Sequence, residues 1–205
     1  MVANFFSWFV VLLILIESGV MLINRDWRVQ LGALAMQYLA AFWLVTRHLP
    51  FAMGSAKLVT GWMVVAALGM TRLSLTENTE DENDTFRPRG QWFPIVLIGI
   101  VSLVALGATP RIEAATPGLG LQVIAGSLLL IGAGLIHLSI TADIFRAILG
   151  LLTMLIGFEI IYAAVESSIL VAGFLALTNL GLGLVGSYLL IADSSSITTT
   201  EEESL

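Results

Sequence analysis

One glutamate stands where an apolar helix is expected to cross a membrane. Glu159 lies in the run F-R-A-I-L-G-L-L-T-M-L-I-G-F-E-I-I-Y-A-A, and the nearest charged residues along the chain are Arg146 and Glu166. An ionised side chain in the middle of a bilayer costs at least ~2.5 kcal/mol, so it normally faces a bundle interior, a partner or a water path. Burial favours the protonated form of a carboxyl group. The sequence therefore predicts proton or ion handling at Glu159, with a neutral structural clasp between helices as the alternative.

Two further polar residues follow on the same helix. Tyr162 and Glu166 come three and seven residues after Glu159, so the three side chains are expected on one helix face. The two turns between Glu159 and Glu166 cover about 10.5 Å, toward the predicted outer surface. A water chain could follow this face. Glu166 also coincides with the point where the helix leaves the membrane, so a solvated end residue is the alternative.

Two charged residues interrupt other apolar runs. Glu17, with Ser18 beside it, lies a little over one turn from the cytoplasmic end of the first run, where it either functions in proton handling or reaches headgroups and water. Lys57 lies in the third run, at a predicted depth close to that of Glu159. A Lys57–Glu159 contact is therefore one expectation. The other is that the lysine extends its side chain to the nearer interface.

The remaining candidates are one histidine and one asparagine. His137 lies near the cytoplasmic end of the fifth apolar run, where a hydrogen-bonded helix contact is favoured over a metal or haem ligand. The only other histidine, His48, is predicted on the opposite side. With no cysteine in the chain, we expect neither a cofactor nor a metal cluster of recognisable spacing. Asn179, midway along the last run, is expected to donate a hydrogen bond to another helix.

These residues are set in an unusually apolar chain. Hydrophobic residues make up 58% of the sequence and charged residues only 12%, against about 25% in soluble domains. The runs are continuously apolar and do not alternate, which favours helices over the strands of a membrane barrel. The net charge of −6 comes largely from one loop and the tail, so it does not point to nucleic acid. The start, M-V-A-N-F-F-S-W, lacks a basic region and a cleavage site, so we expect the first span to be retained. We predict an all-α polytopic transmembrane bundle in a lipid bilayer.

Seven transmembrane helices of about the required length are expected. They cover residues 5–23, 29–45, 51–71, 92–108, 119–140, 147–165 and 170–191. The chain divides into an N-terminal three-helix membrane unit (1–73), an acidic cytoplasmic loop (74–91), a fourth helix with an outer loop (92–118), a second three-helix unit (119–191) and a disordered acidic tail (192–205). The second span is short and contains Gln37, so a re-entrant segment is the alternative there.

The arginines predict the orientation. With seven crossings, one side of the membrane receives six arginines, and the other side receives Arg47 and Arg111. The six are Arg25, Arg28, Arg72, Arg87, Arg89 and Arg146. Loops rich in arginine stay in the cytoplasm, so the N-terminus is predicted outside and the C-terminus in the cytoplasm.

The segment from Leu119 to Ile191 resembles a known family of small membrane subunits. Its M-L-I-G-F-E-I sequence and the basic turn before it are similar to the K subunit of respiratory complex I and to the C subunit of multi-subunit Na+/H+ antiporters. Those proteins have three helices, and Glu159 stands at the position of their membrane glutamate. The complex I subunit usually carries a second glutamate in its third helix. Asn179 stands near that place here, so a two-glutamate relay would need Glu166 as the substitute.

The whole arrangement resembles the E component of hydrogenase-4 and formate hydrogenlyase complexes. The counterparts of its basic turn, Gln-containing helix and intramembrane lysine would be Arg25 and Arg28, Gln37 and Lys57. The resemblance implies a non-catalytic, cofactor-free subunit of a bacterial plasma membrane complex, with antiporter-like and redox membrane subunits as partners. Its implied role is to pass protons laterally.

Two alternatives stand beside this expectation. One is a structural or assembly subunit without a proton role. The other is a stand-alone small ion transporter, against which the lack of evident repetition between the halves counts, because many transporters are built from repeats.

Overall fold

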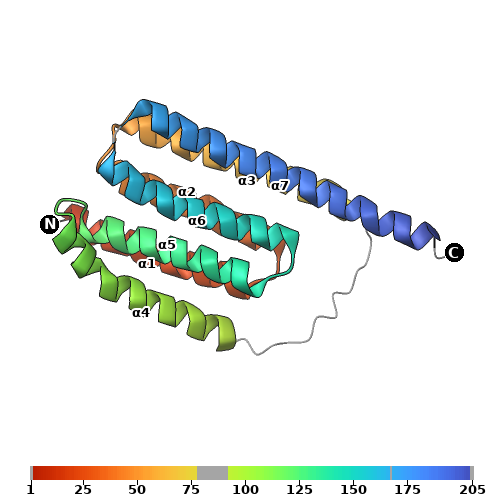
Figure 1. Cartoon of the computed structure of the whole chain (residues 1–205), viewed down its shortest axis with the longest axis horizontal. Helices are drawn as coiled ribbons and strands as arrows, with labels where there is room; N and C mark the ends of the chain where they lie inside the picture. The colour runs from red at the N-terminus through yellow and green to blue at the C-terminus, as the bar shows by residue number, and fades with distance from the viewer. Residues whose placement is uncertain (1, 78–91, 167, 204–205) are drawn as a thin grey trace.

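The computed structural model describes residues 2–77, 92–166 and 168–203, and these residues form seven helices without a strand (Figure 1). The helices are α1 (Val2–Ile23), α2 (Trp27–Val45), α3 (Phe51–Glu77), α4 (Trp92–Ala115), α5 (Leu121–Ile140), α6 (Ile144–Val165) and α7 (Ile169–Glu203). Six of them are long and apolar enough to cross a membrane. The predicted all-α polytopic membrane bundle is confirmed.

The helices pack in two layers. One layer holds α1, α2 and α3, and the other holds α4, α5, α6 and α7 (Figure 1). Helix α5 lies on α1, α6 on α2, and α7 on α3, while α4 lies at the edge against α5 and α1. The two predicted three-helix units are therefore stacked face to face, and α2 and α6 occupy the centre. A residue on α2 or α6 is positioned to meet side chains from both layers.

Both central helices, α2 and α6, begin with an aspartate N-cap. The side chain of Asp26 accepts a hydrogen bond from the backbone N–H of Arg28 at 2.9 Å, and Asp143 accepts one from that of Phe145 at 3.2 Å. An aspartate at this position satisfies a backbone donor that the first turn of a helix leaves without a partner. The short turns before α2 and α6 are thereby fixed at the same end of the bundle. At that end, the guanidinium of Arg72 lies 5.1 Å from the centre of the Phe145 ring.

Helix α2 differs in composition from the other six. It is not apolar enough to count as a membrane span by itself, yet it is one continuous helix of 19 residues packed against α1, α3 and α6. Its polar residues Gln30 and Gln37 are almost completely buried. These side chains lower the hydropathy of α2 without facing lipid. The structure therefore shows one continuous helix at this place.

Helices α5 and α6 approach closely at glycines. A Cβ atom added at Gly134 would lie 2.6 Å from the carbonyl oxygen of Gly150, and one added at Gly157 would lie 2.7 Å from that of Ser127. Small residues allow the backbones of membrane helices to approach in this way. The contact holds α6, and with it Glu159, at a fixed distance from α5.

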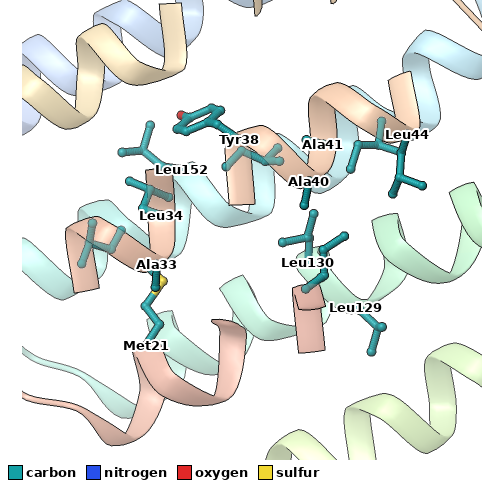
Figure 2. Close-up of a cluster of buried hydrophobic side chains, with 14 of the residues drawn as sticks. Met21, Ala33, Leu34, Tyr38, Ala40, Ala41, Leu44, Leu129, Leu130 and Leu152 are labelled. Carbon is teal, nitrogen blue, oxygen red and sulfur yellow. The ribbon is translucent and has the colours of Figure 1, made fainter. Parts of the chain in front are cut away.

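Apolar side chains fill the space between the layers. Figure 2 shows Leu34 and Leu44 of α2 gathered with Leu130 of α5 and Leu152 of α6, all of them buried. Tyr38 stands at the edge of this cluster, with its hydroxyl oxygen at the far end of the ring (Figure 2). The polar sites described below are therefore enclosed by an apolar interior that excludes water.

The predicted ends of three helices, α3, α4 and α7, were wrong. Helix α4 does not end at residue 108, because it continues through Pro110 to Ala115. The Thr109 hydroxyl donates to the Ala105 carbonyl at 2.7 Å, and Glu113 accepts from the backbone N–H of Gly120 at 3.0 Å in the following turn. Side chains thus provide hydrogen bonds around the proline, whose own nitrogen cannot donate.

The C-terminal tail, predicted to be disordered from residue 192, is helical as far as Glu203. No glycine or proline follows Gly186, so nothing in the sequence stops the helix after it leaves the apolar segment. Helix α3 likewise extends beyond residue 71 to Glu77. Residues 78–91 of the predicted acidic loop, with Arg87 and Arg89, lie outside the described residues.

Candidate functional site

A buried ion pair joins the two layers. The Nζ atom of Lys57 on α3 lies 3.6 Å from Oε2 of Glu159 on α6, and the two side chains are 10% and 8% exposed. Lys57 comes six residues after the start of α3, and Glu159 comes six residues before the end of α6, so each lies about 9 Å from the same end of the bundle. The structure thus brings together the two residues expected at a common depth.

The second carboxylate oxygen of Glu159 has a different environment. Oε1 is buried and has no hydrogen-bond partner among the described residues. A cavity of about 10 Å³ lies beside the ion pair, lined by Tyr38, Lys57 and Glu159 together with apolar side chains such as Phe42. A water molecule needs about 10–15 Å³ of such space. The volume of the cavity is thus at the lower limit for a single water molecule.

A second buried contact completes this region. The hydroxyl of Tyr38 on α2 donates a hydrogen bond to Oδ1 of Asn179 on α7 at 2.7 Å. Asn179 makes the interhelical hydrogen bond predicted for it, but as the acceptor. The Tyr38 ring lies directly on Gly61 of α3, where an added Cβ atom would overlap the ring. Only glycine at position 61 leaves room for the ring in this orientation.

The four helices α2, α3, α6 and α7 thus converge on one polar site. We call Tyr38, Lys57, Glu159 and Asn179 the paired site, because each of them has a polar partner on another helix. The carboxyl group can hold or release a proton, the ammonium can donate one, and the phenol can reorient its hydroxyl. The paired site therefore has the groups that proton transfer needs, and its apolar surroundings exclude bulk water.

A hydrogen-bonded bridge crosses the bundle next to the paired site. Nε2 of Gln37 on α2 donates to the Ser18 hydroxyl of α1 at 3.4 Å, and the Thr153 hydroxyl of α6 donates to Oε1 of Gln37 at 3.1 Å. All three residues are buried. Gln37 directly precedes Tyr38, so the bridge and the paired site share one turn of α2.

Glu17 is buried without a partner. The residue is 6% exposed, and neither carboxylate oxygen has a hydrogen-bond partner in the described part of the chain. Glu17 directly precedes Ser18 of the bridge. It lies six residues before the end of α1, about 9 Å from that end. It therefore lies nearer the end of the bundle opposite to the one closest to Glu159.

The structure separates the other candidates from Glu159. Tyr162 is only partly buried and packs against Phe158, with ring centres 6.0 Å apart. Glu166 is exposed and forms the C-terminal cap of α6, where its backbone N–H donates to the Tyr162 carbonyl. Glu166 therefore lies at the exposed end of α6, and among the described residues no hydrogen bond connects it with Glu159.

His137 lies elsewhere, in the contact between α5 and α6. It is 3% exposed, its Cβ atom lies against Gly150, and Nε2 has no hydrogen-bond partner among the described residues. The expected hydrogen bond to a helix is therefore not made through Nε2. No set of three or more His, Cys, Asp or Glu side chains within residues 2–77, 92–166 and 168–203 is arranged to hold a metal ion.

Sequence reasoning missed three members of the polar network. Tyr38 and Thr153 were not singled out, and Gln37 was noted as a polar residue in a short span and as the counterpart of a Gln-containing helix, without a predicted partner. A signal existed in the pair Gln37-Tyr38, because two consecutive polar side chains in a membrane helix point to different neighbours. The packing of the Tyr38 ring on Gly61 could not be predicted from the sequence, because a glycine has no side chain that indicates its neighbour.

The chain matches no known family model, no curated protein and no solved structure.

Proposed function

We propose that this chain is an integral membrane subunit of a proton-translocating, energy-converting complex, and that Glu159 passes protons within it. The observation that carries the proposal is the buried Lys57–Glu159 ion pair in the interior of an apolar helical bundle. Ionisable residues at membrane depth are costly, and they mark ion pathways and proton relays. The resemblance of residues 119–191 to the K subunit of complex I points to the same position.

The chemistry of the pair is a proton exchange between two coupled groups. A proton that arrives at the Glu159 carboxylate forms a neutral carboxylic acid and removes the negative charge opposite the Lys57 ammonium. The ammonium is then left without its counter-charge in an apolar site, which favours movement of the Lys57 side chain away from Glu159. The small cavity lined by Glu159 and Lys57 is the place where a single water molecule would deliver the proton.

The proposed partners follow from the resemblance. Antiporter-like and redox membrane subunits would lie beside the chain in a bacterial plasma membrane. The chain itself would carry no cofactor and perform no redox step, and its proton movement would be driven by reactions elsewhere in the complex.

A structural role is the second candidate, and one observation favours it. Lys57 lies on α3 and Glu159 on α6, so the ion pair clasps the two layers of the bundle together. Loss of one partner from a buried pair costs about 3–5 kcal/mol. In this case the pair would hold the subunit in shape, and no proton would pass through it.

Glu159→Gln separates the two functions. The variant would be introduced into the native complex, and both the amount of assembled complex and proton pumping into inverted membrane vesicles would be measured. We expect assembly to persist and pumping to be lost, because the amide keeps the shape of the side chain but cannot exchange a proton. Glu166→Gln on the same helix is the matched control, and its pumping should remain normal.

The other outcomes have definite meanings. Normal pumping by an assembled Glu159→Gln complex would refute the relay. Loss of assembly with the pumping per remaining complex unchanged would establish the clasp. Ion transport by the purified chain alone in liposomes would instead favour the stand-alone transporter.

A further inference from the structure

We propose that Glu17 is a second proton-binding site of this chain, connected to the helix of Glu159 by the bridge of Ser18, Gln37 and Thr153. This goes beyond the proposed function, because it concerns the binding of a proton at a separate place and does not require that Glu159 translocates protons.

The first part of the proposal, that Glu17 binds a proton, rests on the burial of its side chain. Both of its carboxylate oxygens are buried, and the part of the chain that the structure describes offers neither of them a hydrogen bond. An ionised carboxylate without a partner in such a place costs several kcal/mol. A proton is the ligand that removes this charge without requiring further coordinating groups. The geometry therefore favours a carboxylic acid at Glu17.

The neighbouring helices do not supply a counter-charge. Helix α1 packs against α2, α4 and α5. The charged and titratable residues of these helices are Arg28 and Tyr38 on α2, Arg111 and Glu113 on α4, and His137 on α5, and Arg47 lies in the turn that follows α2. Within the described residues, Tyr38 bonds to Asn179 and Arg47 to Ser7, and none of the six donates a hydrogen bond to Glu17.

The second part of the proposal, the connection between Glu17 and the helix of Glu159, rests on the bridge of Ser18, Gln37 and Thr153. Ser18 adjoins Glu17, and Met21, one turn further along α1, lies 3.8 Å from the Thr153 hydroxyl through its sulfur atom. Gln37 links Ser18 to Thr153, which precedes Glu159 by six residues, or about 9 Å along α6. A change in the charge or hydrogen bonding of Glu17 therefore acts on a turn of α1 that contacts the helix of Glu159.

The two carboxyl groups lie toward opposite ends of the bundle, with the bridge between them. Glu17 is near the end that carries the α1–α2 turn, and Glu159 is near the end that carries the α2–α3 turn. We infer that protonation of one group changes the protonation of the other through the Gln37 amide.

Infrared spectroscopy of the full-length purified chain tests the first part of the proposal. The carbonyl stretch of protonated carboxylic acids would be followed in liposomes during a pH titration, in sodium-free buffer, for the wild type, Glu17→Gln and Glu159→Gln. We expect a component of this band that is present in the wild type and in Glu159→Gln but lost in Glu17→Gln. A Glu17→Gln spectrum that matches the wild type at every pH would overturn the proposal.

Two further variants protect the test from a folding defect and probe the bridge. If Glu17→Gln does not fold, Glu17→Asp keeps a carboxyl group in a shorter side chain, and the band should shift in frequency. An unchanged band would again refute the site.

Gln37→Met removes the bridge, and the titration midpoints of both carboxyl groups should move. Thr109→Val, which removes a buried hydroxyl that donates to the Ala105 carbonyl of its own helix α4, is the control and should leave both midpoints unchanged. Unchanged midpoints in Gln37→Met would refute the connection.

Discussion

Glu17 and Glu159 are both buried glutamates of a membrane bundle, but their surroundings differ. Glu159 faces the Lys57 ammonium at 3.6 Å and lies beside a small cavity. Glu17 has neither an ion pair nor a hydrogen bond from the residues that the structure describes. The difference teaches that burial alone does not define the state of a carboxyl group. A buried carboxylate with an ammonium partner can remain ionised, whereas one without a partner must be neutral to be tolerated.

The strongest test of this comparison removes the partner from the paired carboxyl group. Lys57→Met leaves Glu159 buried without its counter-charge, so the free energy of unfolding should fall by about 3–5 kcal/mol. Unfolding in detergent, followed by circular dichroism, measures the loss. The double variant Lys57→Met, Glu159→Gln should recover most of it, because no charge then remains in the site. A single Lys57→Met variant as stable as the wild type would show that the pair contributes nothing to stability.

A smaller effect is expected when the paired site is disturbed through its packing. Gly61→Ala places a methyl group where the Tyr38 ring lies, so the ring must move away from Asn179. Overpacking of this kind typically costs about 1–3 kcal/mol. Gly181→Ala on α7 is the control, because nothing lies within 4 Å of its added Cβ atom and its stability should not fall. Equal stability of the two variants would contradict the described position of Tyr38.

The smallest effect is expected at the unpaired carboxyl group. Glu17→Gln replaces one neutral side chain with another and removes no hydrogen bond, so its unfolding free energy should change by less than about 1 kcal/mol. The same detergent unfolding experiment measures it. A loss as large as that of Lys57→Met would show that Glu17 is ionised and paired, and the contrast between the two carboxyl groups would disappear.

The fold was largely predictable, because continuous apolar runs allow few structures in a bilayer. The ends of the helices were not. The residues after 108 were expected to form an outer loop, but α4 continues through Pro110 to Ala115, and side-chain hydrogen bonds of Thr109 and Glu113 accompany this continuation. The polar residues after Ile191 were expected to be disordered, although nothing in that segment ends a helix. Polar composition predicts where the chain leaves the apolar segment, but it does not predict where the helix ends, because a helix can continue into water.

The site was predictable in part. The common depth of Lys57 and Glu159 suggested their contact, because depth follows from counting residues along a span. The rotation of a helix about its axis does not follow from such counting. Tyr162 and Glu166 were therefore placed near Glu159 along one face, while the structure directs Glu159 inward and leaves Glu166 exposed at the helix end. The Tyr38–Asn179 contact joins residues 141 positions apart, so no local sequence pattern predicts it.

The most direct test of the central claim is to purify the tagged protein from its native membrane in mild detergent and to identify the accompanying proteins by mass spectrometry. The account predicts that antiporter-like and redox membrane subunits are recovered with it in fixed proportion. Recovery of the chain alone, as a stable monomer or homo-oligomer, would contradict the proposal that it is a subunit of an energy-converting complex.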